Sequence, residues 1–397
     1  MKKKRIIISH RYIYPDKSHC SLILYNIAKH LNYDGYCVKI ISSYPSYRKN
    51  SSKIKISKEK IKDLSVERIN LANESTSMFK RIINSILLGL FLIKKSFFFK
   101  PDLIVVTSIP PILGGFFGIL CKKIFKCKLI YFCMDIHPEI GLISNDYKNN
   151  ILKKFFFLLD NYTCSKTDKI IVHSSDMKAS LIDRGVQYKD KILIINNFAK
   201  QNNVSITKKK YTKLDGFLKI IYAGNIGRFQ SLENILIAMK LINNKNIELN
   251  IVGEGSKKNE LENFSKKNNL NVNFLGYLSQ NKIADLIDIS DICLVTLMPE
   301  IYKYAYPSKI MTYLSRGKPI IATVELDSEI ANSIINEKYG YVVNQNDYNS
   351  LAKLLLKISH DGNLLKNLNH NSKKAFDKFF SEKVILNKWS SLIKDVI

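Results

Sequence analysis

A glycine-rich loop with a basic residue is the sharpest chemical signal in the sequence. Tyr222-Ala-Gly-Asn-Ile-Gly-Arg-Phe-Gln-Ser-Leu-Glu continues an apolar run that predicts a β-strand, and a helix is predicted to begin near Ser231. Gly224 and Gly227 let a backbone approach a ligand closely, and a helix N-terminus favours an anion such as phosphate. Arg228 adds a guanidinium that can donate two hydrogen bonds to one anion. A tight strand-to-helix turn explains the loop alone equally well.

Three more loops in the second half have a similar composition. They are Ile251-Val-Gly-Glu-Gly-Ser, Asn273-Phe-Leu-Gly-Tyr-Leu-Ser and Tyr306-Pro-Ser-Lys-Ile-Met-Thr-Tyr-Leu-Ser-Arg-Gly-Lys-Pro. In the third, a helix is predicted to open near Pro307, so Ser308 and Lys309 lie in its first turn. The helix dipole disfavours a cation there, which indicates an anionic ligand. A solvated lysine is the alternative.

In the first half, polar residues follow a predicted strand at Lys128–Met134, in the order Asp135-Ile-His-Pro-Glu. Ligands of open α/β sheets bind outside the carboxyl ends of the strands. We therefore take Asp135, His137 and Glu139 as candidate catalytic residues and expect them to line a cleft between two domains. For His137, an ordinary loop histidine is the alternative.

Twelve short apolar runs predict the strands that must position these loops. Continuous Ile, Val and Leu residues are typical of parallel strands buried under helices on both faces. The runs are Arg5–His10, Val38–Ser43, Leu103–Ser108, Lys128–Met134, Lys169–His173, Lys191–Asn196, Leu218–Gly224, Ile247–Gly253, Val272–Leu275, Ile292–Leu297, Pro319–Thr323 and Tyr341–Val343. Helices predicted between them include Ser21–Leu31, Leu232–Ile242 and Lys282–Ile289. This alternation predicts repeated βαβ units.

The pattern runs twice along 397 residues, a length that suits two domains of roughly 150–200 residues. We expect an α/β protein with two Rossmann-like, doubly wound parallel-sheet domains facing a central cleft. The expected boundaries are 1–197 for the first domain, 198–217 for a polar linker, 218–380 for the second domain and 381–397 for a C-terminal helix that such folds allow to cross back to the first domain.

The charge is strongly basic and uneven: the net charge is +28, of which residues 1–200 contribute +20. Such a protein favours an anionic partner, namely nucleic acid, an acidic membrane or a phosphorylated substrate. The lysines are dispersed and form no stripe with aromatic residues, so we expect no nucleic-acid partner. The seven cysteines form no CxxC pair, which predicts buried reduced thiols and no metal site. Only three apolar residues, Ile6–Ile8, follow the basic start, so no signal peptide is expected.

Residues 78–100 depart from the alternation. Their uninterrupted apolar stretch, Ile86–Ile93, has eight residues, against about 20 needed to span a bilayer. We predict a helix that lies in a membrane interface with Phe97–Phe99 inserted. Its lysines would lie near lipid phosphates; they are Lys94, Lys95 and Lys100. A packing helix of the first sheet is the alternative.

The order and spacing of these loops resemble GT-B glycosyltransferases of family 4. The second half is similar to their donor-binding half, and most similar to the branch of fucosamine and colanic-acid transferases of bacterial surface-polysaccharide clusters. In the first half, His10-Arg-Tyr-Ile-Tyr-Pro-Asp resembles the family's opening loop, and Asp135-Ile-His-Pro-Glu resembles its Asp-x-x-Pro-Glu element. The resemblance covers nearly the whole chain.

The resemblance implies a role for each matching position. Arg228 and Lys309 would bind the donor diphosphate, and the backbone at Leu275–Gly276 would contact the nucleobase. Asp135, His137 and Glu139 would be catalytic, and Tyr14 and Asp16 would belong to the acceptor loop. The implied donor site comprises Gly224, Asn225, Gly227, Arg228, Gln230, Gly253, Leu275, Gly276, Ser308, Lys309 and Thr312.

The sequence departs from the family pattern at five positions. Asn225 and Gln230 stand where many members have Arg and Lys in the first loop. The family's Glu-x7-Glu pair falls on Tyr304 and Thr312, so both carboxylates are missing, although Thr312 offers one hydroxyl to a ribose. His19 stands where the opening loop usually has Gly.

The resemblance implies retaining transfer of a sugar from a nucleoside-diphospho-sugar, a UDP-sugar being favoured. The acceptor would be a lipid-linked glycan or an oligosaccharide of O-antigen or capsule biosynthesis. No DxD triplet is present, so we expect no metal and no cofactor, with Arg228 and Lys309 stabilising the leaving diphosphate. The basic first half then predicts a cytoplasmic protein attached peripherally to the inner face of the plasma membrane. Two alternatives stay open: a nucleotide-sugar 2-epimerase, and a degenerate scaffold of a polysaccharide complex.

Overall fold

The structure is a computed structural model. It describes residues 3–16, 18–45, 58–61, 64–72, 77–143, 149–199, 217–361 and 363–397. The chain divides into two compact units. The first unit comprises Met1–Asn196, Tyr304–Tyr306 and Ile385–Ile397, and the second comprises Asn197–Lys303 and Pro307–Val384. Most of the expected linker, with its lysines, lies outside the described residues.

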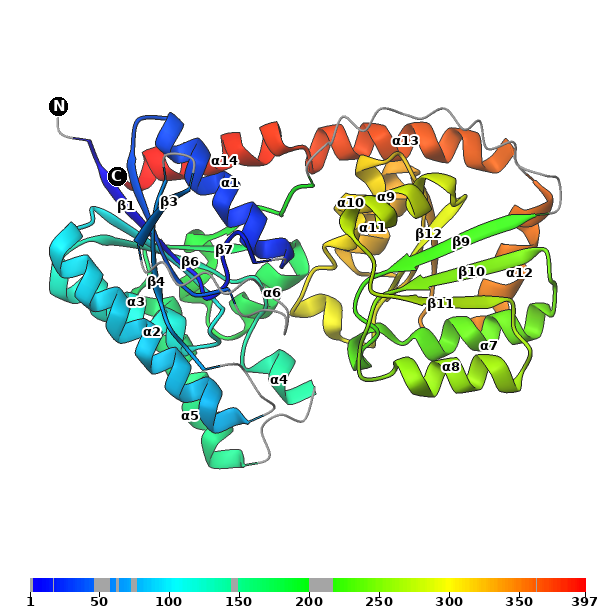
Figure 1. The fold of residues 1–397 in the computed structure, drawn as a ribbon, viewed down its shortest axis with the longest axis horizontal. Helices are drawn as coiled ribbons and strands as arrows, with labels where there is room; N and C mark the ends of the chain where they lie inside the picture. Colours follow the sequence, from blue (N-terminus) through cyan, green and yellow to red (C-terminus); the bar gives the residue numbers. More distant parts are fainter. Residues whose placement is uncertain are drawn as a thin grey trace. The chain divides into compact units, whose positions relative to one another are not determined.

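The first unit is built on an eight-stranded sheet in the order β3-β4-β2-β1-β5-β6-β7-β8 (Figure 1). Of these described strands, seven run parallel, and β3 pairs antiparallel with β4 at one edge. The bounds are β1 Arg5–Ser9, β2 Cys37–Ser43, β3 Lys58–Ile61, β4 Leu64–Ile69, β5 Leu103–Thr107, β6 Lys128–Phe132, β7 Lys169–Val172 and β8 Ile192–Ile194. β5 is buried along its whole length because Leu-Ile-Val-Val-Thr packs on both faces.

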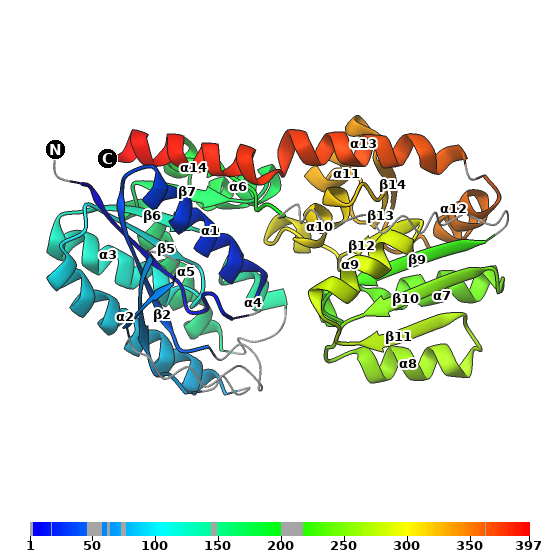
Figure 2. The ribbon, with the colours of Figure 1, turned by 45° about the horizontal axis from the view of Figure 1, so that its top comes forward.

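Helices cover both faces of this sheet. The bounds are α1 His19–Tyr33, α2 Met78–Phe99, α3 Leu113–Phe125, α4 Glu139–Ile143, α5 Asn150–Lys166 and α6 Ser175–Asp183, followed by a short 3-10 turn, η1 Val186–Lys191. The right-handed crossovers from β4 to β7 put α2, α3 and α5 side by side on one face, with α1 on the other (Figures 1 and 2).

α2 is longer than the apolar stretch that marked it in the sequence. It has 22 residues, and Phe79–Phe99 has a mean hydropathy of 1.7, enough by length and composition alone to cross a membrane. This corrects the expectation that the segment is too short to span. One stripe of the helix, which includes Asn84, Leu88 and Leu92, is buried, and α2 packs on α3, where a Cβ at Gly89 would lie 2.1 Å from the Phe117 ring. α2 is therefore a packing helix along one face, with the opposite stripe exposed.

The second unit contains a six-stranded parallel sheet in the order β11-β10-β9-β12-β13-β14. Its strands are β9 Leu218–Ala223, β10 Ile247–Val252, β11 Val272–Gly276, β12 Ile292–Thr296, β13 Ile320–Thr323 and β14 Gly340–Val343. Its helices are α7 Leu232–Ile242, α8 Lys258–Lys267, α9 Gln280–Ile289, α10 Lys309–Ser315, α11 Glu329–Glu337, α12 Tyr348–His360 and α13 Asn363–Phe379, with 3-10 turns η2 Arg228–Gln230 and η3 Ile301–Lys303. α7 and α12 pack together over a core that includes Ile220, Leu249 and Leu355.

The last helix, α14 Glu382–Val396, belongs to the first unit from Ile385 onward. Trp389 is fully buried there, and its ring lies 5.4 Å from the Phe132 ring at the end of β6. Ser390 Oγ lies 2.9 Å from Nε2 of His30 on α1. The C-terminal turns of the chain are thus part of the core of the first unit.

The predicted fold class is confirmed: two parallel α/β sheets with helices on their faces. All twelve predicted strands are present, with ends that differ by one or two residues at most. β3 and β4 were not predicted. Five of the seven cysteines are buried as expected, whereas Cys37 is exposed and Cys20 is partly exposed.

Candidate functional site

The loops after β9 and β10 pack backbone against backbone. The amide of Gly224 donates to Val252 O at 2.9 Å, and the amide of Ile226 donates to Glu254 O at 3.0 Å. A Cβ at Gly253 would lie only 1.8 Å from the carbonyl oxygen of Gly224. Glycine at 253, which also has φ of +145°, is therefore required for the two loops to meet at the edge of the sheet.

Two tyrosine hydroxyls form hydrogen bonds to the backbone of the loop that follows β9. The hydroxyl of Tyr222 donates to the carbonyl of Asn225 at 2.6 Å, and the hydroxyl of Tyr313 accepts from the amide of Ala223 at 2.8 Å. Both rings are buried. Neither tyrosine was predicted to belong to the site, although Tyr222 stands in the first motif and Tyr313 follows Thr312.

Lys309 reaches this loop from the first residue of α10. Its Nζ lies 3.9 Å from the centre of the Tyr222 ring, and a Cβ at Gly224 would lie 3.2 Å from the same nitrogen. Among the residues that the structure describes, no carboxylate pairs with Lys309. Burial lowers the pKa of Lys309 to about 7, because little water solvates the ammonium and no anion replaces it.

The remaining polar residues of the first loop differ in exposure. Arg228 and Asn225 are exposed, whereas Gly227 is buried and its amide donates to Gln230 Oε1 at 3.1 Å. Gln230 is also held through its carbonyl, which accepts from the hydroxyl of Thr296 on β12. Gln230 thus shapes the loop, and Arg228 is left at the surface of the same turn. The convergence of Arg228 and Lys309 on one anion stays a prediction.

The other expected donor residues lie on neighbouring elements of the second unit. Leu275 and Gly276 end β11, where Leu275 is 38% exposed and Gly276 has φ of +64°. The amide of Gly253 donates to the carbonyl of Gly276 at 2.8 Å, so the three strand ends form one edge. Ser308 caps α10, and Thr312 lies one turn into that helix. All the implied donor positions therefore belong to one unit, around the carboxyl ends of β9, β10 and β11 and the start of α10.

In the first unit, polar side chains gather at the carboxyl ends of β1, β5 and β6. His10 follows β1 and is buried, with Nδ1 2.7 Å from the hydroxyl of Thr107 at the end of β5. Burial lowers the pKa of His10 to about 3, so its ring is neutral at pH 7. The buried Nε2 of His10 has no hydrogen-bond partner among the described residues. No role was predicted for His10, although it begins the opening-loop motif; its place at the carboxyl end of the first predicted strand was the available signal.

Asp135 lies three residues beyond β6. Its amide donates to Ser108 Oγ at 3.2 Å, and it forms an antiparallel bridge with Ala305, one of the three residues 304–306 that belong to the first unit. Burial raises the pKa of the Asp135 carboxyl to about 6. The carboxyl of Asp135 is close enough to the thiol of Cys20 to affect its ionisation. Loss of solvent around the thiol is the main cause, and the negative charge of Asp135 the second, that raises the pKa of Cys20 to about 12.

Glu139 has a structural partner that the sequence did not reveal. Nε of Arg184 donates to Glu139 Oε1 at 2.7 Å, and Nη2 donates to Oε2 of the same carboxylate. Arg184 also donates to the carbonyl of His137 at 2.7 Å and to the buried carboxylate of Asp160. Arg184 thus joins the loop of His137 to α5, and both oxygens of Glu139 are engaged. This geometry gives Glu139 a positioning role; a catalytic role for it stays a prediction.

The opening loop is also held by an arginine. Arg68 is buried on β4 and donates to Tyr14 O at 2.6 Å and to Ser43 O at 3.0 Å. The Tyr14 side chain is 42% exposed, whereas Asp16 is buried and accepts from the Ser21 hydroxyl through its backbone carbonyl at 2.6 Å. Tyr14 is thus available to a ligand, and Asp16 lies inside the loop.

The family comparison concerns the second half of the chain. Residues 203–375 match the family model described as "Glycosyl transferases group 1". The chain is 24% identical over 316 residues to the probable glycosyltransferase WbjE of Pseudomonas aeruginosa, covering 75% of this chain and 76% of that protein. It is 22% identical over 259 residues to the capsular polysaccharide biosynthesis glycosyltransferase CapM of Staphylococcus aureus, covering 60% and 65%.

Solved structures share the fold. Sucrose-phosphate synthase from Thermosynechococcus elongatus aligns over 99% of both chains with a TM-score of 0.79 at 16% identity. Anabaena HepE in complex with UDP aligns over 99% of this chain and 100% of that chain, with a TM-score of 0.73 at 14% identity. At such identities the likeness shows a shared fold and nothing about substrate.

Proposed function

We propose that this chain is a group 1 glycosyltransferase, the family whose model matches residues 203–375, and that it moves a sugar from a nucleoside-diphospho-sugar to a glycan acceptor of bacterial surface-polysaccharide biosynthesis. A UDP-sugar is favoured as donor, since HepE, which shares the fold, is described in complex with UDP. A lipid-linked glycan or an oligosaccharide is favoured as acceptor, since the similar protein CapM is named for capsular polysaccharide biosynthesis.

The observation that carries the proposal is the ammonium of Lys309 at the edge of the second sheet. It lies against the Gly224 backbone and over the Tyr222 ring, and no described carboxylate neutralises it. Lys309 is partly buried, and a partly buried cation without a counter-ion costs free energy that an anionic ligand can remove. A diphosphate fits this requirement, and Arg228 on the same loop supplies a second cation.

The reaction would break the bond between the anomeric carbon of the sugar and the diphosphate oxygen. Negative charge then grows on the leaving diphosphate, and a preorganised ammonium stabilises that charge more than it stabilises the bound substrate. We assign this role to Lys309, with Arg228 as an exposed partner. Leu275 and Gly276 are assigned to the nucleobase and Thr312 to the ribose.

We assign the acceptor to the carboxyl edge of the first sheet. His10, Thr107 and Asp135 lie at the carboxyl ends of three neighbouring strands, and such edges bind ligands in open α/β sheets. A carboxyl whose pKa is raised to about 6 can accept a proton from a sugar hydroxyl near neutral pH. His137 is assigned to the same edge, and Arg184 fixes its loop.

We also propose that the protein is cytoplasmic and attached peripherally to the inner face of the plasma membrane through α2. The exposed stripe of this helix contains Phe79, Leu87, Leu90 and Phe98, the last 72% exposed. Two expected contacts are corrected: Lys95 pairs with Glu67, and Phe99 is only partly exposed, with Nζ of Lys39 4.7 Å from its ring centre. The side chains of Lys94, Phe97 and Phe98 are exposed, as contact with a membrane requires.

The test is a product assay with radiolabelled UDP-sugars, with and without a lipid-linked glycan acceptor. Transfer to the acceptor with release of UDP supports the proposal. Conversion of the sugar at C2 without an acceptor would identify an epimerase, and binding without any turnover would identify a scaffold; either result would overturn it.

A further inference from the structure

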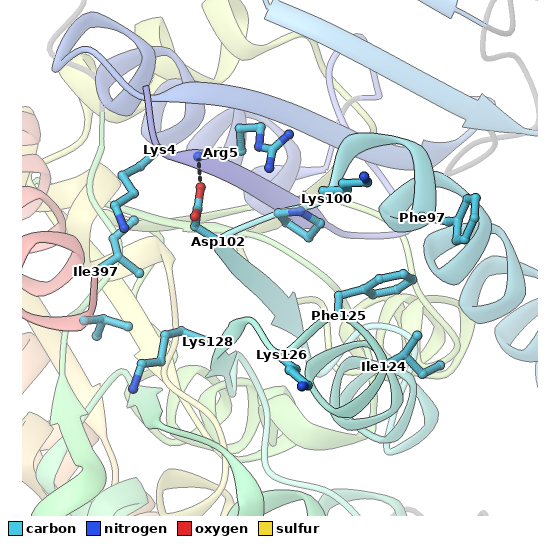
Figure 3. Close-up of a pocket in the computed structure, with 12 residues that line it drawn as sticks. Lys4, Arg5, Phe97, Lys100, Asp102, Ile124, Phe125, Lys126, Lys128 and Ile397 are labelled. Carbon is cyan, nitrogen blue, oxygen red and sulfur yellow. Dashed lines mark hydrogen bonds between the residues drawn. The ribbon is translucent and has the colours of Figure 1, made fainter. Parts of the chain in front are cut away.

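A basic cavity of about 670 Å³ opens at the edge of the first sheet opposite to Asp135 and His10 (Figure 3). Arg5 begins β1, Lys128 begins β6, and Asp102 directly precedes β5, so the cavity lies at the amino ends of the central strands. The site residues that the family resemblance implies lie around the carboxyl ends of the strands. This cavity is a separate feature.

The side chains around the cavity are mainly cationic. Its ionisable side chains are Lys4, Arg5, Lys100, Asp102, Lys126 and Lys128. Asp102 is already engaged, because one of its oxygens accepts from the backbone amide of Arg5 at 2.7 Å, the dashed line in Figure 3. Lys100 and Lys126 cap the C-termini of α2 and α3, where each helix end contributes roughly half a negative charge. The end of α14 at Val396 also lines the cavity. After three such half charges and the charge of Asp102 are subtracted from the five cations, a net side-chain charge of about +2.5 remains.

Two of the cations have little compensation among the described residues. The buried Nε of Arg5 has no hydrogen-bond partner there. Lys128 Nζ lies 3.7 Å from an oxygen of Asp168, whose closer partner is Lys122 at 2.7 Å. The cavity therefore favours an anion that can approach several donors at once.

Apolar side chains form the rim of the same cavity. Phe97 at the end of α2 is 64% exposed, and Ile124 at the end of α3 is 56% exposed. Figure 3 shows both on the same side of the cavity as Phe125. Phe97 also continues the exposed stripe of α2 that contains Leu90 and Phe98. A ligand with a phosphate group and a hydrocarbon chain would complement this cavity, because the phosphate would meet the cations and the chain would meet the apolar rim.

We propose that this cavity binds the phosphate headgroup of an anionic phospholipid, with the acyl chains along Phe97 and Ile124. The inference deepens the membrane attachment proposed above and rests on it. It adds a defined headgroup site to a surface otherwise held by general attraction between lysines and lipid. An acidic peptide would satisfy the cations but would leave the apolar rim unexplained.

The test is co-sedimentation with phosphatidylcholine vesicles that contain or lack phosphatidylglycerol. Lys100→Gln/Lys126→Gln should weaken partitioning onto the anionic vesicles about 30-fold, because each lysine near an anionic surface contributes roughly five-fold. The matched control is Lys80→Gln/Arg81→Gln, which removes the same charge from the other, exposed end of α2. The cavity proposal predicts a smaller loss for this control, and an equal loss would show that only diffuse attraction acts.

Further variants and ligands distinguish a failure of the headgroup site from a failure of membrane attachment. Leu90→Ser/Phe98→Ser should lower binding to both kinds of vesicle, since it removes apolar insertion; a wild-type protein that binds neither kind would refute membrane attachment itself. UDP-glucose affinity should be unchanged in every variant, which checks folding and keeps the donor site independent. Saturable binding of glycerol phosphate or of an acidic peptide, without vesicle binding, would assign the cavity to another ligand and overturn the proposal.

Discussion

The Nζ atom of Lys309 lies 3.9 Å from the centre of the Tyr222 ring, at the carboxyl edge of the second sheet. The electron-rich face of the ring attracts the ammonium but supplies no negative charge to neutralise it. Tyr222 also fixes the loop by donating to Asn225 O at 2.6 Å. One aromatic side chain thus positions both the loop and the cation that we assign to the donor diphosphate.

We predict that Lys309→Ala lowers turnover by roughly 10²–10³, the cost of losing one donor that acts mainly in the transition state. Donor affinity should change less than turnover, because the developing charge is larger than the ground-state charge. Steady-state kinetics with a UDP-sugar would measure both. Lys353→Ala, an exposed lysine of the same unit on α12, is the control and should be close to wild type. Equal losses of turnover and affinity would assign Lys309 to ground-state binding.

Donor affinity should depend on pH through Lys309. Burial lowers the pKa of the free lysine to about 7, and a bound diphosphate should raise it. Affinity for UDP-glucose should therefore be level below about pH 7 and weaken by up to about ten-fold per unit above it. Calorimetric titration from pH 6 to pH 9 would measure this dependence. In Lys309→Arg the dependence should vanish because a guanidinium stays charged.

Most strand positions could be predicted from the sequence, because buried parallel strands consist of short continuous runs of apolar residues. Lys-Ile-Ile-Val at β7 and Leu-Lys-Ile-Ile-Tyr-Ala at β9 are examples. β3 and β4 were missed because charged residues interrupt the apolar runs of Lys-Glu-Lys-Ile at the edge of the sheet and of Leu-Ser-Val-Glu-Arg-Ile beside it. The charge of Glu67 on β4 is compensated by Lys39 and Lys95, which only the fold brings near.

Site residues that stand in glycine-containing motifs could be predicted from the sequence. Site residues whose role depends on a partner far along the chain could not. Gly224 and Lys309 stood in motifs, and the structure brings them into contact. The Arg184 contacts to Glu139 and Asp160 span 45 and 24 residues, so no local pattern marks them. His10 resembles any residue after a strand until its contact with Thr107, 97 residues away, is seen.

Arg184→Ala should destabilise the first unit by about 3–5 kcal/mol, because it removes the cation that pairs with both the buried carboxylate of Asp160 and the largely buried carboxylate of Glu139. Urea denaturation would measure the change in the free energy of unfolding. Lys257→Ala removes the exposed pair with Glu260 and should cost no more than about 1 kcal/mol. A similar, small cost in both variants would refute the positioning role of Arg184.

Asp135→Asn should lower transfer activity while raising stability at neutral pH. Burial raises the pKa of Asp135 to about 6, so the folded protein holds this proton more tightly than the unfolded chain, whose carboxyl titrates near about 3.9. Stability contributed by this group is therefore present below about pH 4 and is lost as pH rises toward 6. Thermal unfolding should show the variant gaining most at pH 7 and least at pH 4. Asp285→Asn, an exposed residue of α9, should show no such trend.

Gly253→Ala should abolish donor binding with only a moderate loss of stability. A Cβ at this position would lie 1.8 Å from the carbonyl oxygen of Gly224, so the loop that carries Asn225 and Arg228 must move. The matched control is Gly35→Ala, where φ is also positive, +96°, but no atom lies within 4 Å of the added Cβ. Both variants should pay the backbone strain of roughly 1–2 kcal/mol, and only Gly253→Ala should lose affinity for UDP-glucose. If both variants bind UDP-glucose like the wild type, the donor does not depend on the contact between these two loops, and the assigned site is wrong.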